Sequence, residues 1–134
     1  MAFTDFLKWD LDVKLYPIAS SGLSNHCFKK KSAEIWIRES QSLYQRTATF
    51  FHEILHIDVA ENPEIWRAIA EEYITENNRL FVRRIDNLRL YPKGIRLQGE
   101  AIEEAIDKIA RKLAYVYEDV EDIVIKYKLG QNRS

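Results

Sequence analysis

The sequence lacks several features that mark common classes of protein. Cysteine occurs once, at Cys27, so no intramolecular disulfide can form and a reducing compartment is the simpler expectation. No apolar run approaches the ~20 residues of a membrane span, and the first ten residues contain no apolar stretch of signal-peptide length. The formal net charge is −1, so no overall field attracts nucleic acid or an anionic membrane. We therefore expect a soluble, cytoplasmic protein with no membrane partner.

Glycine and proline are also scarce, with four and three among 134 residues. This length, with 46% hydrophobic and 31% charged residues, predicts one domain over residues 1–134 with a modest core. These few glycine and proline residues separate short secondary-structure elements in the first third of the chain. These are a short helix over Phe3–Leu11, a strand over Val13–Ile18, a turn over Ser20–Ser24, and strands over His26–Lys30 and Glu34–Arg38. Lys31 and Ser32 join the last two as an antiparallel hairpin with a lysine-rich tip.

From Ser42 onward the apolar residues recur at helical spacing. Ser42 and Gln45 form a capping-box pattern, and Asn62-Pro63 ends this first helix. Pro63 suits the first turn of a second helix that runs to about Asn77, with helical pattern continuing toward Leu90. A loop over Tyr91–Gln98 then precedes a long helix from Glu100 to about Lys128. We predict an α+β fold, in which a roughly three-stranded sheet packs on the first helix and further helices follow.

The first helix contains the segment His52-Glu53-Ile54-Leu55-His56. Residues four apart lie on one face of a helix, so both imidazoles can meet one metal ion, and zinc is the metal that this pattern favours. Glu53 can reach a water molecule at the metal without being a ligand, and can act as general base on it. In a chain of this composition the pattern would arise by chance roughly once in 150 sequences. It therefore indicates zinc-dependent hydrolysis, with Glu53 as the catalytic residue.

A catalytic zinc site needs a third protein ligand and one position open to water. No histidine follows His56, so we expect a carboxylate. Glu76 near the end of the second helix is one candidate. Glu100, Glu103 and Glu104 at the start of the last helix are the others. Each also has an ordinary explanation as a solvated or first-turn acid, so spacing alone leaves the choice open.

The segment from Cys27 to Asp58 resembles predicted zinc metallopeptidases of phages and bacteria that are related to the ImmA/IrrE and SprT-like zincins. The residues that carry the resemblance are Cys27, Ile35-Trp36-Ile37, Gln45, Thr47 and the run His52–Asp58. The later segment Glu103–Leu113 matches a helix of that family, which opens with paired acids. The resemblance covers about residues 12–60 and 98–120. Residues 61–97 are a longer insertion than the small phage members carry.

This resemblance implies a minimal zincin-like fold with Zn²⁺ as the cofactor. It also implies that Glu103 is the third ligand, because Asp107 follows four residues later. In the gluzincin pattern an acid at that position orients a zinc-bound imidazole. The implied substrate is a protein or peptide. A DNA-associated protein target is a further possibility, since such proteases act on DNA-binding repressors or DNA-bound proteins.

Other residues suggest roles that the sequence does not decide. A basic stretch from Arg79 to Arg96 suits either a solvated helix face or a nucleic-acid contact. The oxyanion that develops during hydrolysis of a peptide bond needs a hydrogen-bond donor or a positive charge to stabilise it. The candidates are Tyr73, Tyr115, Tyr117, Arg38, Arg111 and His26. The three tryptophans, Trp9, Trp36 and Trp66, are expected in the core.

The predicted function is hydrolysis of a peptide bond by a zinc metallopeptidase. In one alternative the chain binds zinc without catalysis, with Cys27 or His26 as a fourth ligand that closes the site. In the other the histidines are structural and the protein is a nucleic-acid-associated phage or mobile-element protein.

Overall fold

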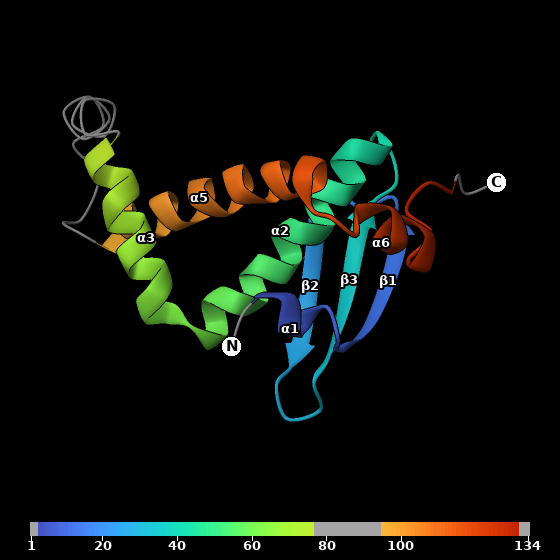
Figure 1. Ribbon diagram of the computed structural model, residues 1–134, viewed down its shortest axis with the longest axis horizontal. Helices are drawn as coiled ribbons and strands as arrows, with labels where there is room; N and C mark the ends of the chain where they lie inside the picture. The colour runs from blue at the N-terminus through green and yellow to red at the C-terminus, as the bar shows by residue number, and fades with distance from the viewer. Residues whose placement is uncertain (1–2, 77–94, 132–134) are drawn as a thin grey trace.

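The computed structural model describes residues 3–76 and 95–131, with side chains from 4 to 72 and from 101 to 131. Three strands form a small mixed sheet and helices accompany it, so the predicted α+β class is confirmed (Figure 1). In chain order the elements are α1 (Phe3–Phe6), β1 (Asp10–Tyr16), β2 (Gly22–Cys27), β3 (Ser32–Arg38), α2 (Leu43–Glu61), α3 (Pro63–Glu76), α5 (Ile95–Val116) and α6 (Val120–Lys126).

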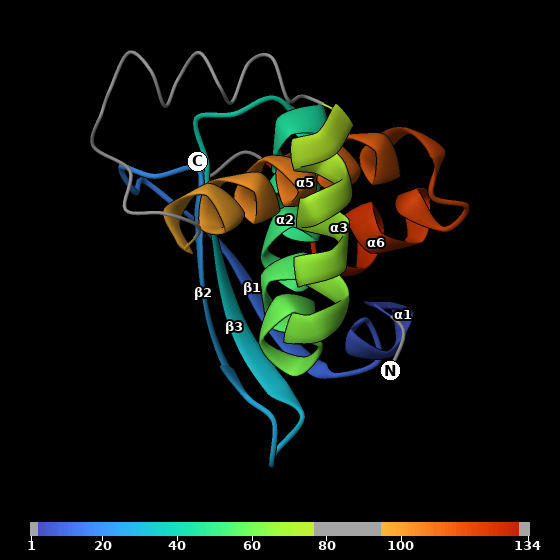
Figure 2. The same ribbon diagram turned by 90° about the vertical axis from the view of Figure 1, so that its left-hand side faces the viewer.

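The helices lie on one face of the sheet, which Figure 2 shows nearly edge-on. Ala33, Ile35 and Ile37 of β3 alternate toward this face and are at most 5% exposed, because successive side chains of a strand point to opposite faces. The predictions for Trp9 and Trp66 are confirmed, since both are buried in this core. The prediction for Trp36 is wrong: it lies between Ile35 and Ile37, points to the outer face and is half-buried.

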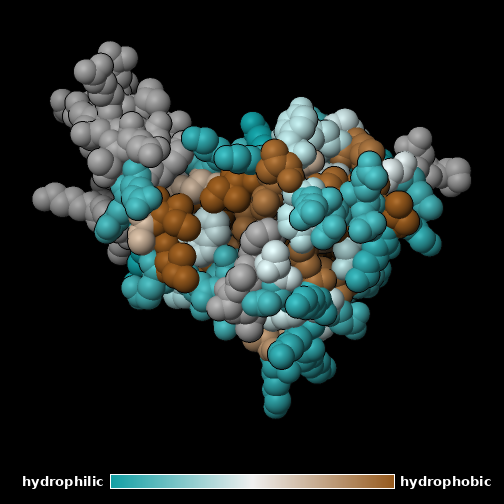
Figure 3. All heavy atoms as spheres, viewed as in Figure 1, coloured by the Kyte–Doolittle hydropathy of each residue, from teal (hydrophilic) through white to brown (hydrophobic). Residues whose placement is uncertain are grey.

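The sheet has the order β1-β3-β2, so β2 is an edge strand. β1 pairs with β3 in parallel, and β2 pairs with β3 as the predicted antiparallel hairpin. The hairpin turn lies at Phe28–Lys31, earlier in the chain than the predicted Lys31-Ser32. β2 includes Gly22–Ser24, for which the sequence pattern predicts a turn. Phe28 leaves the strand because its ring packs edge-on against the buried Trp9. The lysines that follow form a hydrophilic projection, at the bottom of Figure 3.

The prediction of a helix over Phe3–Leu11 is wrong beyond Phe6. Residues from Asp10 onward pair with β3 in an extended conformation, so the helix cannot continue through Leu11, and Phe6 and Trp9 are both buried beside this start of the sheet. That pairing starts where the Asp10 amide donates to the Lys31 carbonyl at 3.0 Å. The first strand therefore runs over Asp10–Tyr16 rather than Val13–Ile18.

The boundaries of α2 agree with the sequence pattern. The capping box of Ser42 and Gln45 forms with both of its hydrogen bonds. At the other end Asp58 accepts hydrogen bonds from the side chains of Asn62 and Trp66. These bonds join the end of α2 to α3, which begins at Pro63 as predicted and is described as far as Glu76.

The last third of the chain differs from the prediction in two places. α5 already begins at Ile95, so Ile95–Gln98 are helical rather than a loop; Gly99 is tolerated inside the helix at a cost of about 1 kcal/mol. The helix also ends at Val116 rather than Lys128. Tyr117 packs edge-on against Phe51, and after this turn α6 brings Ile123 into the core.

Some sequence predictions lie outside the described residues. These are the helical continuation to Leu90 and the first residues of the Tyr91–Gln98 loop. The side chains of the basic stretch from Arg79 to Arg96 also lie outside them. Within the part that the structure describes, no helix is both long and apolar enough to cross a membrane. Of the predicted insertion 61–97, α3 is described, and it packs against α5.

Candidate metal centre

His52 and His56 lie one turn apart on α2, on the side that meets α5. Their side chains are 20% and 39% exposed, so both rings are partly shielded but reachable. The rotation of α2 about its axis is fixed by neighbouring residues that are at most 2% exposed, namely Phe51, Ile54, Leu55 and Ile57. Because those residues occupy the core, the two histidines are held toward the rim.

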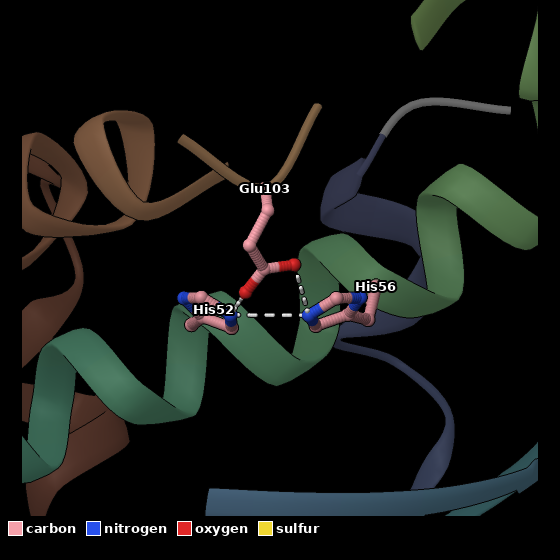
Figure 4. Close-up of side chains that lie close together, drawn as sticks. All are labelled: His52, His56 and Glu103. Carbon is pink, nitrogen blue, oxygen red and sulfur yellow. Dashed lines mark hydrogen bonds and ion pairs between the residues drawn. The ribbon is translucent and has the colours of Figure 1, made fainter. Parts of the chain in front are cut away.

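Glu103 reaches the same point from α5 (Figure 4). Its Oε1 lies 2.8 Å from Nε2 of His52 and its Oε2 lies 3.2 Å from Nε2 of His56. The two Nε2 atoms are 3.0 Å apart. Two elements that are distant in sequence therefore bring two imidazoles and one carboxylate to a single point.

The spacing of these atoms suits a metal ion with short bonds. Ligands at a tetrahedral zinc ion, with bonds of about 2.0–2.1 Å, lie roughly 3.3 Å from one another. The three separations of 2.8, 3.0 and 3.2 Å would have to widen by no more than about half an ångström to admit the ion. Two imidazoles and a carboxylate are also a common ligand set for zinc. The residues present therefore fit the metal that the sequence predicts.

The structure separates the candidate third ligands. Glu103 belongs to the group, and Glu104, the next residue of α5, does not. The side chains of Glu76 and Glu100 lie outside the described residues. In the described part of the chain, neither Cys27 nor His26 joins the group, so no fourth protein ligand closes it. Both instead line a separate hollow beside Asp10 and Asp12.

Asp107 lies on the other side of the His52 ring. Its Oδ1 is 3.8 Å from Nδ1 of His52, which is an ion-pair distance but too long for a direct hydrogen bond. Its Oδ2 lies 3.1 Å from the guanidinium of Arg111, one turn further along α5. Asp107 is thus placed to favour the tautomer with the proton on Nδ1, which leaves the lone pair of Nε2 free for a metal.

Glu53 is only 7% exposed and lies against the edge strand. The Ser24 hydroxyl donates a hydrogen bond of 2.8 Å to its Oε2. Its Oε1 lies close to Gly22, 3.3 Å from where a Cβ on that glycine would be. A buried carboxylate is costly unless it is hydrogen-bonded, so core stability alone does not explain an acid at this position.

His52, Glu53 and Glu103 lie at a cleft of about 680 Å³. Its floor is the first half of α2, and its walls are the start of β2 and the α5 face that carries Asp107 and Arg111. Most of its lining is polar, and the side chains that make it so are Ser20, Ser21, Gln41, Ser42, Gln45 and Thr49. A cleft of this size and polarity suits a hydrophilic ligand larger than a single amino acid.

The structure also shows which candidate oxyanion donors line the cleft. Arg38 and Arg111 line the cleft. Tyr115 does not: it is 77% exposed and its ring lies 4.6 Å from that of Tyr44. Tyr117 packs against Phe51, and burial, with Asp119 and Glu118 nearby, raises the pKa of its phenol. His26 contacts Phe28 at the far end of β2, and the side chain of Tyr73 lies outside the described residues.

Sequence reasoning missed Gly22, Ser24 and Tyr44. Gly22 and Tyr44 line the cleft, and Ser24 binds Glu53. One signal was present in the segment Gly22–Cys27, because its alternate residues Gly22, Ser24 and His26 are not aliphatic. Such residues on the helix-facing side of a strand indicate a polar partner, but the segment was assigned in part to a turn.

In comparisons with known proteins, no family model, no curated protein and no solved structure matches this chain. The geometry of its own residues therefore carries the functional argument.

Proposed function

We propose that this protein is a zinc-dependent peptidase of the zincin type, with His52, His56 and Glu103 as the zinc ligands and Glu53 as the general base. The observation that carries the proposal is the convergence of three ligand atoms from two helices beside a cleft that also holds a buried carboxylate. Within the described residues the group has three members. That is the number of protein ligands in catalytic zinc sites, whereas structural sites have four.

Zinc, when bound there, would supply Lewis acidity toward a carbonyl oxygen and toward water. The protein's own groups would do the remaining chemistry. Because Oε2 of Glu53 accepts from Ser24, Oε1 is the atom left to take a proton from the attacking water and deliver it to the leaving amine. Arg38 and Arg111 supply positive charge in the cleft, where a developing oxyanion needs it.

Two features support a peptide as the substrate. The cleft is polar and large enough for several atoms on each side of a scissile bond. It is also bordered by the first residues of β2, which is one of the two edge strands of the described sheet. An edge strand offers backbone donors and acceptors to an extended peptide. A DNA-associated target stays a prediction from the resemblance.

The metal site is tested by the zinc content of the purified protein, measured by plasma mass spectrometry. We expect about one zinc per chain in the wild type and in Glu104→Gln, and little in His56→Ala or Glu103→Gln. Glu104→Gln is the matched control, because it makes the same chemical change one position along α5. A wild-type protein that takes up no zinc, even from added zinc, would overturn the proposal.

Catalysis is tested with a random-sequence library of internally quenched peptides. The zinc-loaded wild type should cleave a subset of the library. Glu53→Gln should keep its zinc and lose at least about 100-fold in rate, the lower range for removing a general base. Full activity in Glu53→Gln would assign the proton transfer to another group and contradict the mechanism.

A further inference from the structure

The inner face of β2 differs from the inner faces of the other two strands. In register, Ser24 lies beside Ile35 and Val13, and Gly22 lies beside Ile37 and Leu15. The residues of β1 and β3 in these rows are aliphatic and pack on the core. Only β2 presents a small or polar residue in each row, so its inner face is not built for hydrophobic packing.

The reason lies in the side chains that α2 presents to this strand. Glu53 and Thr49 face β2, and both are less than a tenth exposed. Gly22 lets the strand come so close that a Cβ there would lie 2.5 Å from Cγ2 of Thr49. Ser24, two residues on, then donates its hydroxyl to Glu53. β2 and α2 therefore pack closely at Gly22 and are joined by a hydrogen bond to the carboxylate of Glu53.

We propose that Ser24 is a positioning residue for Glu53, an inference that rests on the proposed peptidase function. The hydroxyl holds Oε2 of Glu53 and so leaves Oε1 as the oxygen that would accept the proton of the attacking water. Without this bond the carboxylate would remain in the cleft wall but would sample other rotamers. A misplaced base lowers the rate of the chemical step and leaves substrate binding unchanged.

A purely structural role would not call for this pair. Replacing a buried hydrogen-bonded pair by apolar residues of similar shape is often neutral or stabilising. The Ser24–Glu53 pair beside the aliphatic residues of β1 and β3 therefore gives no advantage in stability over an apolar pair such as valine and leucine. Orientation of the carboxylate is what the pair provides and an apolar pair cannot.

The first test uses the library peptide that the wild type cleaves fastest. We expect Ser24→Ala to lower kcat by roughly 10-fold, with KM and zinc content unchanged, because only the orientation of the base is lost. Ser24→Thr keeps the hydroxyl and should restore most of kcat. Asn25→Ala is the matched control, since Asn25 lies on the same strand and points to the opposite face.

A second test needs neither zinc nor substrate. In the metal-free protein, Ser24→Ala should lower the melting temperature by roughly 5 °C when Glu53 is present. In a Glu53→Ala background the same change should have less than half that effect, because the partner is gone. Equal shifts in the two backgrounds would mean that the hydroxyl does not hold Glu53, and would overturn the inference.

The two proposals fail in different ways. If the zinc-loaded wild type cleaves peptides and Ser24→Ala cleaves them equally fast, the positioning role is wrong and the peptidase stands. If the wild type binds zinc and cleaves no peptide of the library, the peptidase proposal fails and the positioning role fails with it. A fall in kcat that Ser24→Thr reverses supports both.

Discussion

Two acids lie on opposite sides of the His52 ring, and their positions bear on which ring nitrogen would be available to a metal. Glu103 contacts Nε2, whereas Asp107 lies on the Nδ1 side and is itself paired with Arg111. A carboxylate near Nδ1 favours the proton there and raises the basicity of Nε2. At the scale of single residues, metal affinity should therefore depend on a side chain that is not itself a ligand.

Asp107→Asn should weaken zinc binding by about 10- to 100-fold, the usual cost of losing a group that orients a ligand. The reason is that a neutral amide no longer favours the tautomer with a free Nε2. Competition with a chromophoric chelator measures the affinity. Lys108→Ala, one position along and exposed, is the control. An unchanged affinity in Asp107→Asn would show that His52 needs no such partner.

The approach of β2 to α2 determines the geometry of the cleft at the scale of secondary-structure elements. Gly22 is a point of close approach, because an added Cβ would meet Thr49, the Trp36 carbonyl and Glu53 within 3.3 Å. Any larger residue must therefore push the strand and the helix apart. The Ser24–Glu53 hydrogen bond, made two residues further along the same strand, would lengthen with that separation.

Gly22→Ala should destabilise the protein by about 1–3 kcal/mol, the range for overpacking a well-filled site. Thr49→Ser removes the methyl group nearest to the new Cβ and keeps a hydroxyl for Gln41. In that background Gly22→Ala should cost about 1 kcal/mol less. Urea unfolding of the wild type, the two single variants and the double variant measures the cost of Gly22→Ala in each background. Equal costs in the two backgrounds would mean that Thr49 is not the obstacle.

At the scale of the whole molecule, two polar clusters join parts of the chain that are distant in sequence. One is the proposed metal centre, where side chains of α2 and α5 meet only in the folded state. The other is Arg46, 6% exposed, whose guanidinium donates to the carbonyls of Glu39, Leu129 and Gln131. Arg46 thereby ties the end of the chain to the start of α2.

Zinc should stabilise the fold by an amount that rises with the logarithm of its concentration once that concentration exceeds the dissociation constant. At about 100 times the dissociation constant, a ligand that binds only the folded state adds about 2.7 kcal/mol. Thermal melts with and without zinc measure the effect, and a chelator should reverse it. Glu103→Gln, under the same zinc concentration, should show little shift. A shift as large as that of the wild type would place the zinc elsewhere.

Arg46→Met should destabilise the protein by about 3 kcal/mol, since it leaves three carbonyls near the core without their donor. Arg67→Met is the control: Arg67 is exposed and its ion pair with Glu64 should contribute less than about 1 kcal/mol. Urea unfolding compares the two variants. Similar losses in both would contradict the anchoring role of Arg46.

Several boundaries followed from local sequence patterns. The capping box at Ser42 and the end of α2 before Asn62-Pro63 lie where the sequence placed them. The spacing of His52 and His56 also fixed their common face. Errors arose where a distant contact decides the local structure. Phe28 turns toward Trp9, and the chain bends at Tyr117, whose ring packs against Phe51.

Local sequence patterns were enough to predict the α+β class and the common face of His52 and His56 with Glu53 beside them, because each depends on residues close together in the chain. Only the tertiary structure separated Glu103 from Glu104 and brought Ser24 to Glu53. One residue along a helix changes the direction of a side chain by about 100°. Which of two neighbouring acids meets the histidines is therefore decided by how α5 is rotated against α2, and that rotation depends on the packing of the whole core.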